Sequence, residues 1–65
     1  MDIKYNNSLI KIVKTEYHNK DYIDIRKYYL DKETQEWKPT KKGISIEISF
    51  VEKVIEGVKS VKNAV

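Results

Sequence analysis

The sequence predicts an α+β fold in which several β-strands are followed by one C-terminal helix. Two observations support this prediction. Residues 9–30 are rich in β-branched and aromatic side chains, which favour strands. From residue 51 onward the apolar residues recur at spacings of three and four, which places them on one side of a helix. At 65 residues, the chain is expected to form one domain over residues 1–65.

The first two predicted strands form a hairpin. Leu9 to Tyr17 and Tyr22 to Leu30 are separated by the polar break His18-Asn19-Lys20-Asp21, which suits a tight turn. Asp21 and Asp24 are three residues apart on such a strand and therefore point to opposite faces, which argues against a carboxylate pair. Met1 to Ser8 read as polar, without the pattern of a signal peptide, and no strand is assigned to them.

Two more strands are predicted before the helix. Asp31 to Gln35 is polar and typical of a turn. Glu36 to Lys42 predicts a short strand that Pro39 confines to a sheet edge or an irregular position. In the next stretch Ile44, Ile46 and Ile48 alternate with polar residues, a period of two that indicates a half-buried strand.

The predicted helix has one apolar stripe and a specific start signal. Ser49 and Glu52 have the spacing of a capping box, which predicts that the helix begins there. Gly57 lowers its intrinsic helicity by about 1 kcal/mol, so the helix needs a surface to pack on. Either a face of the sheet or the same helix of a second copy can supply that surface. The stripe, which is the predicted dimer interface, consists of Val51, Val54, Ile55, Val58 and Val61.

Composition restricts the chemistry available to the chain. It contains no Cys and a single His, His18, so neither a disulfide nor a thiolate metal site is expected, and no metal or cofactor is predicted. Both glycines are isolated, so there is no Gly-rich phosphate loop, and we do not expect an enzyme. No apolar run approaches the ~20 residues of a membrane span, and a cytoplasmic protein is expected. A chain this small without disulfides is expected to rely on oligomerisation.

Aromatic and basic residues are interleaved between Tyr17 and Lys42, and the formal net charge of the chain is +3. Proteins that hold single strands combine a positive groove with aromatic side chains on which bases stack. Tyrosines in strands are also ordinary packing residues, and lysines beside turns are usually just solvated, so composition alone leaves both interpretations open. The aromatic residues concerned are Tyr17, Tyr22, Tyr28, Tyr29 and Trp37.

Two sequence stretches resemble the DNA-binding core of the positive cofactor 4 family of transcriptional coactivators. Residues 23–31 read Ile-Asp-Ile-Arg-Lys-Tyr-Tyr-Leu-Asp, and residues 36–46 read Glu-Trp-Lys-Pro-Thr-Lys-Lys-Gly-Ile-Ser-Ile. The resemblance extends over roughly Tyr17 to Val61. It implies a curved four-stranded antiparallel sheet followed by one helix, dimerised largely through the helices, with channels for single-stranded DNA.

The resemblance also implies binding positions. The residues that match the family's nucleic-acid-binding positions are Tyr17, His18, Lys20, Arg26, Tyr29, Lys38, Lys41 and Lys42. This chain departs from the family pattern in having Tyr29 where a Trp is usual, Thr40 where a Gly is usual, and His18 where a basic residue is usual. The Ser-rich acidic tail of the eukaryotic coactivators is missing, which favours a compact bacterial or viral form of the domain.

Three hypotheses for function follow. The first is a homodimeric protein that binds single-stranded DNA, or RNA, with little sequence preference, as an accessory to the transcription, replication or repair machinery. The second is a β-ribbon repressor whose paired strands enter the major groove of a duplex, for which Arg26 is an available reading side chain. The third is a structural dimer or adaptor that binds no nucleic acid.

Overall fold

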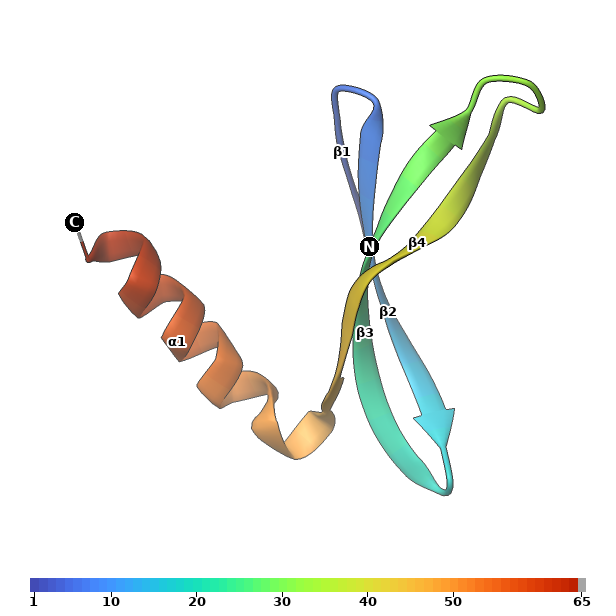
Figure 1. Ribbon diagram of the computed structural model, residues 1–65. Coiled ribbons are helices and arrows are strands. Elements are labelled where there is room, and N and C mark those ends of the chain that lie inside the picture. The colour runs from blue at the N-terminus through green and yellow to red at the C-terminus, as the bar shows by residue number, and fades with distance from the viewer. Residues whose placement is uncertain (65) are drawn as a thin grey trace.

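The structure, a computed structural model, describes residues 1–64 and contains one four-stranded sheet followed by a helix (Figure 1). Each strand is antiparallel to the next, in the order β1-β2-β3-β4. The predicted fold class is therefore confirmed. The elements are β1 (Asp2–Tyr5), β2 (Ser8–Tyr17), β3 (Lys20–Asp31), β4 (Glu36–Glu47), the short 3₁₀ turn η1 (Ile48–Phe50) and the helix α1 (Val51–Asn63).

The hairpin between β2 and β3 closes more tightly than its sequence suggests. Tyr17 pairs with Lys20, so only His18 and Asn19 lie outside the strands. Both have positive φ values, 51° and 63°. Positive φ at both central residues is the geometry whose twist matches that of the flanking strands, and Asn and His tolerate it better than most residues. The predicted four-residue break is thus a two-residue turn.

The strand assignments at the two edges of the sheet need correction. The polar segment before residue 9 contains β1, a short edge strand that alternation in so few residues did not reveal. The predicted strands at 36–42 and 44–48 are instead one strand, β4, interrupted by an irregularity opposite Lys27. Pro39 lies on this second edge strand, as predicted, because an edge position tolerates the missing N–H group.

Alternation along the strands gives the sheet two unlike faces. Residues paired directly across neighbouring strands share a face, so the register assigns each side chain. Asp21 and Asp24 lie on opposite faces, as predicted. One face, here called the aromatic face, carries Lys4, Lys11, Tyr17, Tyr22, Arg26, Tyr28 and Trp37. The other, the isoleucine face, carries Ile3, Ile10, Ile12, Ile23, Ile25, Ile44 and Ile46.

The predicted capping box is wrong. The helix begins at Val51 with Phe50 as its N-cap residue, and no side chain accepts a capping hydrogen bond. Ser49 lies inside η1, whereas an N-cap serine needs an extended backbone to reach the amides of the first turn. The 3₁₀ turn thus moves the N-cap by one residue, from Ser49 to Phe50, and leaves Ser49 and Glu52 without reciprocal bonds.

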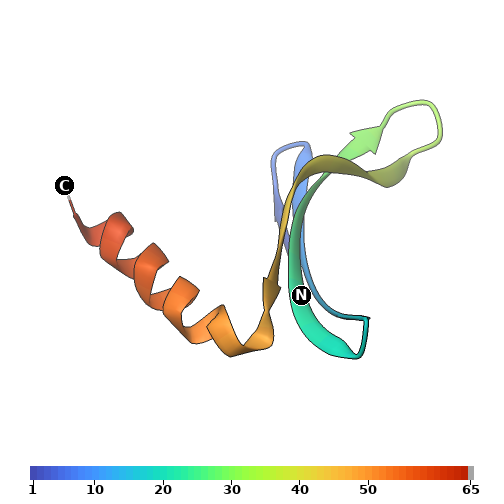
Figure 2. The same cartoon turned by 60° about the horizontal axis from the view of Figure 1, so that its bottom comes forward.

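The helix does not pack on its own sheet. It extends away from the strands in both views (Figures 1 and 2), and its main contacts are with η1. Val58 and Val61 in its apolar stripe are 62% and 76% exposed. Among the described residues, Leu9 and Ile46 are the only buried apolar side chains. One chain alone therefore leaves much of the stripe exposed, and most isoleucines of the isoleucine face are only half-buried. No helix within residues 1–64 has the length and apolarity to cross a bilayer.

Candidate nucleic-acid interface

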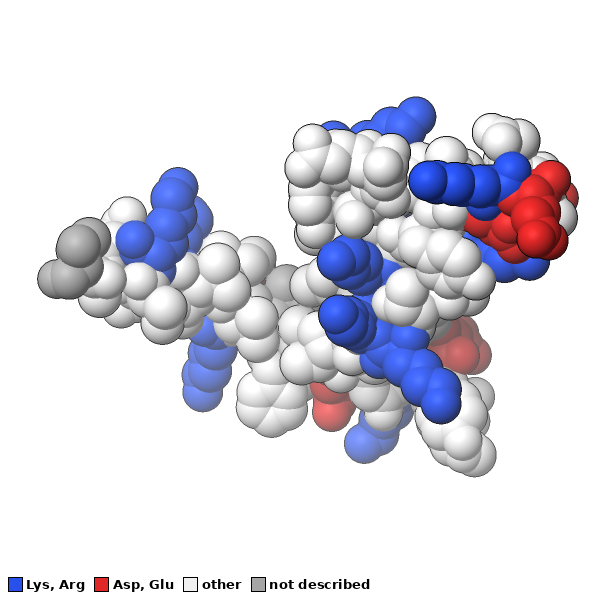
Figure 3. Space-filling model, turned by 45° about the horizontal axis from the view of Figure 1, so that its top comes forward, with Lys and Arg blue, Asp and Glu red and all other residues white. Residues whose placement is uncertain are grey.

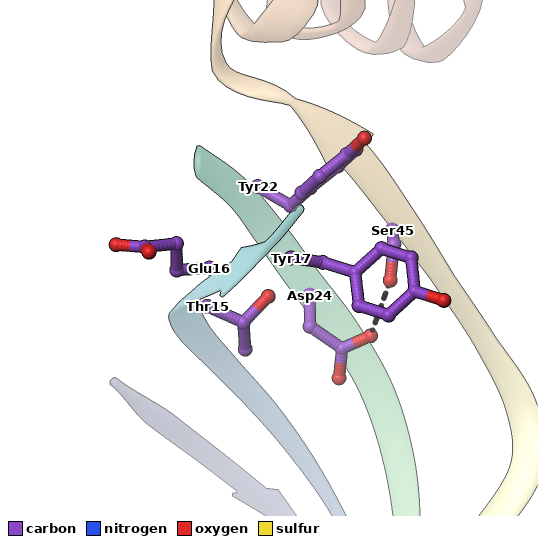
Figure 4. A pocket seen from close by; sticks show the side chains of 6 residues that line it. All are labelled: Thr15, Glu16, Tyr17, Tyr22, Asp24 and Ser45. Carbon is purple, nitrogen blue, oxygen red and sulfur yellow. Dashed lines mark hydrogen bonds between the residues drawn. The ribbon is translucent and has the colours of Figure 1, made fainter. Parts of the chain in front are cut away.

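The end of the sheet beside the β2–β3 turn has a hollow of about 460 Å³ (Figure 4). Tyr17 of β2 and Tyr22 of β3 place their rings beside it, and Tyr17 is 66% exposed. Glu16 also lines the hollow, but its carboxylate points away from the other side chains. The hollow therefore presents two aromatic side chains to solvent on the aromatic face.

The floor of this hollow is polar. The Ser45 hydroxyl donates a hydrogen bond to Asp24 Oδ1 at 3.0 Å, across the β3–β4 pair (Figure 4). The Arg26 guanidinium lies beside the same carboxylate, with Nη2 3.3 Å from Oδ1 and Nε 3.4 Å from Oδ2. Asp24 is thus held by two neighbours and faces the tyrosines as a hydrogen-bond acceptor.

Three predicted binding residues meet at the β2–β3 turn. The rings of Tyr17 and His18 are in edge contact, with centroids 4.0 Å apart and planes inclined by 71°. Lys20 pairs with Tyr17, so its side chain leaves the sheet on the same face. All three are exposed. The turn therefore gathers an aromatic ring, an imidazole and an ammonium group within one small surface.

Arg26, another predicted contact, is half-buried and bound within the chain. Besides its pair with Asp24, it donates from Nη1 to the Thr40 carbonyl at 3.0 Å. It crosses β4 over Gly43, where an added Cβ would lie 2.7 Å from the Arg26 Cζ. Gly43 is thus required for close approach, and Arg26 fixes the irregular part of β4.

Thr40 stabilises the same irregular segment. Its hydroxyl donates to the Lys27 carbonyl at 2.7 Å and accepts the Lys42 amide at 3.1 Å. A glycine here would make neither bond, so this departure from the family pattern has a local structural role. Lys41 and Lys42 are exposed on the segment, and neither has an ion-pair partner within residues 1–64.

Lys38 is less free than the other predicted lysines. Its Nζ lies 2.8 Å from Asp31 Oδ2. The hydrogen bond to Lys38 lowers the pKa of Asp31, with help from the Glu33 and Thr34 amides, and the same bond raises the pKa of Lys38. Tyr29 is paired with Lys38 in the register. A phosphate that binds Lys38 must therefore share it with Asp31.

The eight predicted positions form two groups rather than one. Tyr17, His18 and Lys20 lie at the turn between β2 and β3, whereas the other five lie toward the opposite end of β3 and on β4. By alternation Tyr29 and Lys38 leave their strands on the isoleucine face, unlike Tyr17 and Arg26. The strands twist between these ends, as Figures 1 and 2 show, so the two groups are joined by a twisted surface.

Sequence reasoning gave too little weight to several aromatic residues. Tyr22, which is not among the positions matched to the family's binding residues, borders the hollow. Tyr28 and Trp37 lie on the same face, where Lys11 Nζ is 5.3 Å from the Tyr28 ring centroid and Lys4 Nζ is 5.7 Å from that of Trp37. Had a two-residue turn been predicted, Tyr22 would have been placed on the same face as Tyr17, because Tyr17 then pairs with Lys20 and residues 20 and 22 share a face.

Basic side chains lie across the sheet in the view of Figure 3, whereas the acidic side chains visible there gather mainly at one end. The β3–β4 turn, with Asp31, Glu33 and Glu36, is the acid-rich part of the sheet sequence. Within residues 1–64, no group of three or more His, Asp and Glu side chains is arranged to hold a metal ion. Hydrogen bonding, stacking and charge are the means of binding that this surface offers.

Fold and surface together define a small open-sheet domain with one polar, aromatic face and a single C-terminal helix. Residues 6–57 match the family model described as Transcriptional Coactivator p15 (PC4), and the chain belongs to this family. The match includes β2, most of which precedes the stretch from Tyr17 to Val61 that the sequence resemblance covered.

Known relatives have the same fold. The crystal structure of a PC4 homologue from Burkholderia pseudomallei superposes with a TM-score of 0.85 at 26% identity, covering 100% of this chain and 88% of that one. A bacteriophage T5 homologue of PC4, implicated in recombination-dependent DNA replication, has a TM-score of 0.69 at 21% identity, covering 94% and 74%.

The RNA polymerase II transcriptional coactivator SUB1 of Saccharomyces cerevisiae is 50% identical over 36 residues. That match covers 55% of this chain and only 12% of the yeast protein.

Proposed function

We propose that the chain is a homodimeric protein that binds single-stranded nucleic acid, DNA above all, with little sequence preference. The observation that carries this proposal is the surface beside the β2–β3 turn. There the exposed Tyr17 lies close to Tyr22 and to Lys20, the first residue of β3. Aromatic rings can stack only on bases whose faces are accessible, so they favour unpaired strands. Membership of a coactivator family agrees with this role.

Lysines add attraction for the backbone without reading sequence. Lys41 and Lys42 project from the irregular segment that Arg26 and Thr40 hold in place. Each phosphate they neutralise releases counterions, so affinity falls as salt rises. In this account electrostatics captures the strand and stacking selects single strands over duplex.

A second copy of the chain is the partner that the structure favours. The apolar stripe of α1 lacks a partner within the chain, and a groove along it is lined by Val54, Gly57, Val58 and Val61. A chain with so few buried side chains is not expected to be stable alone. In a twofold dimer the same stripe serves both subunits, and the helices can cover one another.

The other hypotheses fit the surface less well. Arg26, the side chain available for reading a major groove, is bound to Asp24 and to the Thr40 carbonyl, which opposes the β-ribbon repressor. A protein adaptor that binds no nucleic acid would not require Tyr17 to be 66% exposed beside Lys20. We infer a binding role rather than catalysis, as an accessory protein in transcription, replication or repair. The phage homologue is implicated in DNA replication and the yeast relative is named a transcriptional coactivator, and both agree with this inference.

The test is a titration of labelled oligo-dT and of a length-matched duplex, followed by anisotropy at several salt concentrations. We expect oligo-dT to bind at least tenfold more tightly than duplex, with an affinity that weakens steeply with salt. Lys59→Ala, which removes one charge from α1, serves as the control for nonspecific charge effects. Equal affinity for the two ligands contradicts the proposal, and no binding of either at low salt favours the adaptor.

A further inference from the structure

The hollow beside the β2–β3 turn contains polar side chains, Asp24 and Ser45, that nonspecific stacking does not require. We propose that it holds one unpaired base between Tyr17 and Tyr22 and favours cytosine over thymine through the carboxylate of Asp24. The inference rests on the single-strand binding proposed above and adds a base preference at one position of the bound strand.

Three strands build this site. Tyr17 comes from β2, Tyr22 and Asp24 come from β3, and Ser45 comes from β4. All four residues lie on the aromatic face, because Asp24 pairs with Ser45 and Tyr22 pairs with Thr15. Figure 4 shows the carboxylate of Asp24 on the same side of the sheet as the Tyr17 ring. A base lying against the rings therefore has its polar edge near the carboxylate.

Asp24 retains hydrogen-bonding capacity. An ionised carboxylate has about four acceptor positions. Ser45 and Arg26 Nη2 donate to Oδ1, at 3.0 and 3.3 Å, and Arg26 Nε donates to Oδ2 at 3.4 Å, so Oδ2 keeps one acceptor position. Both Arg26 contacts are longer than the roughly 2.7–2.9 Å typical of charge-assisted hydrogen bonds. The side chain of Asp24 is 17% exposed, so it is reachable from the hollow without being fully solvated.

An acceptor at this position distinguishes the two pyrimidines of DNA. Cytosine carries an N4 amino group, which donates to Asp or Glu, whereas thymine has the O4 acceptor in the same place. Placing O4 against a carboxylate leaves two acceptors facing each other. Cytosine and thymine have rings of the same kind, so the comparison between them isolates hydrogen bonding from stacking area.

The experiment compares an oligo-dT with the same oligo-dT carrying a single central cytosine, in competition at equal length and salt. We expect wild type to bind the cytosine-containing strand about fivefold or more tightly, as one good base contact provides. Asp24→Asn keeps an acceptor for the Ser45 hydroxyl but adds a donor, so the ratio should fall to about one. Asp21→Asn removes a carboxylate from the other face of the same strand and should leave the ratio unchanged.

A second variant separates stacking from base preference. Tyr22→Leu should weaken binding of both oligonucleotides by about fivefold or more while keeping their ratio. Wild-type binding of both strands with no preference overturns the base-pocket inference and leaves single-strand binding intact. A preference that survives in folded Asp24→Asn overturns the role of Asp24. Failure of both oligonucleotides to bind wild type contradicts the proposed function itself.

Discussion

The two faces of the sheet are built from the same strands and differ sharply in chemistry. The isoleucine face carries seven isoleucines, since Ile3 pairs with Ile10, yet Ile44 remains 58% exposed, because α1 of the same chain does not cover it. The aromatic face carries tyrosines, a tryptophan and cations, and several of them pair with one another. An exposed apolar face is typical of a site that binds another protein, whereas a face with aromatic rings and basic side chains is suited to nucleic acid.

The difference between the faces allows so short a chain to offer one surface to a second copy and another to nucleic acid. Among the described residues only Leu9 and Ile46 are buried, so a large apolar surface can be covered by a second subunit. In the proposed dimer a second copy covers the helix stripe and the isoleucine face, so the aromatic face stays open to solvent. In this account Tyr17, Lys20 and Tyr22 bind from the aromatic face, whereas the predicted binding residues Tyr29 and Lys38 lie on the isoleucine face.

The largest effect should come from a charge in the helix stripe. Val58→Asp places an ionised group where the second copy is expected to pack, which should cost about 3–5 kcal/mol and dissociate the dimer. Sedimentation would give the mass, and the melting temperature of wild type should rise with protein concentration. Lys53→Asp, which introduces the same side chain outside the stripe, is the control. An unchanged mass for Val58→Asp would break the assignment of this side to assembly.

The next effect compares the two ends of the β2–β3 hairpin. Tyr17→Ala and Tyr29→Ala should each lower single-strand affinity by about 1–3 kcal/mol, because each removes one stacking ring. The two side chains lie at opposite ends of the paired strands β2 and β3, so the losses should add in the double variant. Anisotropy with oligo-dT provides the measurement. If Tyr29→Ala changes the mass of the assembly or its melting temperature and leaves the affinity for oligo-dT unchanged, Tyr29 contributes to assembly or stability and not to binding.

Gly43→Ala tests how the irregular part of β4 is fixed. The added methyl group would lie 2.7 Å from Arg26 Cζ, whose position is held by Asp24 and Thr40. We expect a loss of about 1–2 kcal/mol in the free energy of unfolding, measured by urea denaturation. Combining it with Arg26→Ala should relieve the clash, so the double variant should be less destabilised than the sum of the two single variants. Additive losses would show that Arg26 and Gly43 do not interact.

A smaller effect distinguishes the lysines. Lys41→Ala should weaken binding of all sequences alike and reduce the salt slope by about 0.7, the value for one phosphate on a single strand. Lys38→Ala should have a smaller effect, because the Lys38 ammonium is already paired with Asp31. Salt titrations of the two variants give the comparison. A larger loss for Lys38 would show that nucleic acid displaces Asp31 readily.

The smallest effect concerns pH. The hydrogen bond from Lys38 lowers the pKa of Asp31 below its ordinary value of 3.8, so this carboxylate stabilises the folded chain above that pH. The contribution is lost as pH falls through the lowered pKa. Asp31→Asn should therefore destabilise slightly at pH 7 and have a smaller effect at pH 2. Thermal melting at both pH values measures this, and an equal effect at both would exclude the charge as its cause.

Sequence patterns predicted the central hairpin and the helix stripe because alternation and helical spacing are long there. They missed β1, whose four residues are too few to show a period, and they misplaced the helix start because a 3₁₀ turn occupies Ser49. The two-residue turn at His18 and Asn19 decides which tyrosines share a face, and composition could not supply it. The hollow depends on side chains from three strands, so spacing along one strand could not predict it.

The most direct test of this division between faces is photochemical crosslinking. An oligo-dT carrying 5-iodouracil would be irradiated in complex with the protein, and the crosslinked residues identified by mass spectrometry. The account predicts crosslinks at Tyr17 and Tyr22, beside the turn-end hollow. Crosslinks confined to the helix side, at Phe50 for example, with none at these two tyrosines, would contradict it.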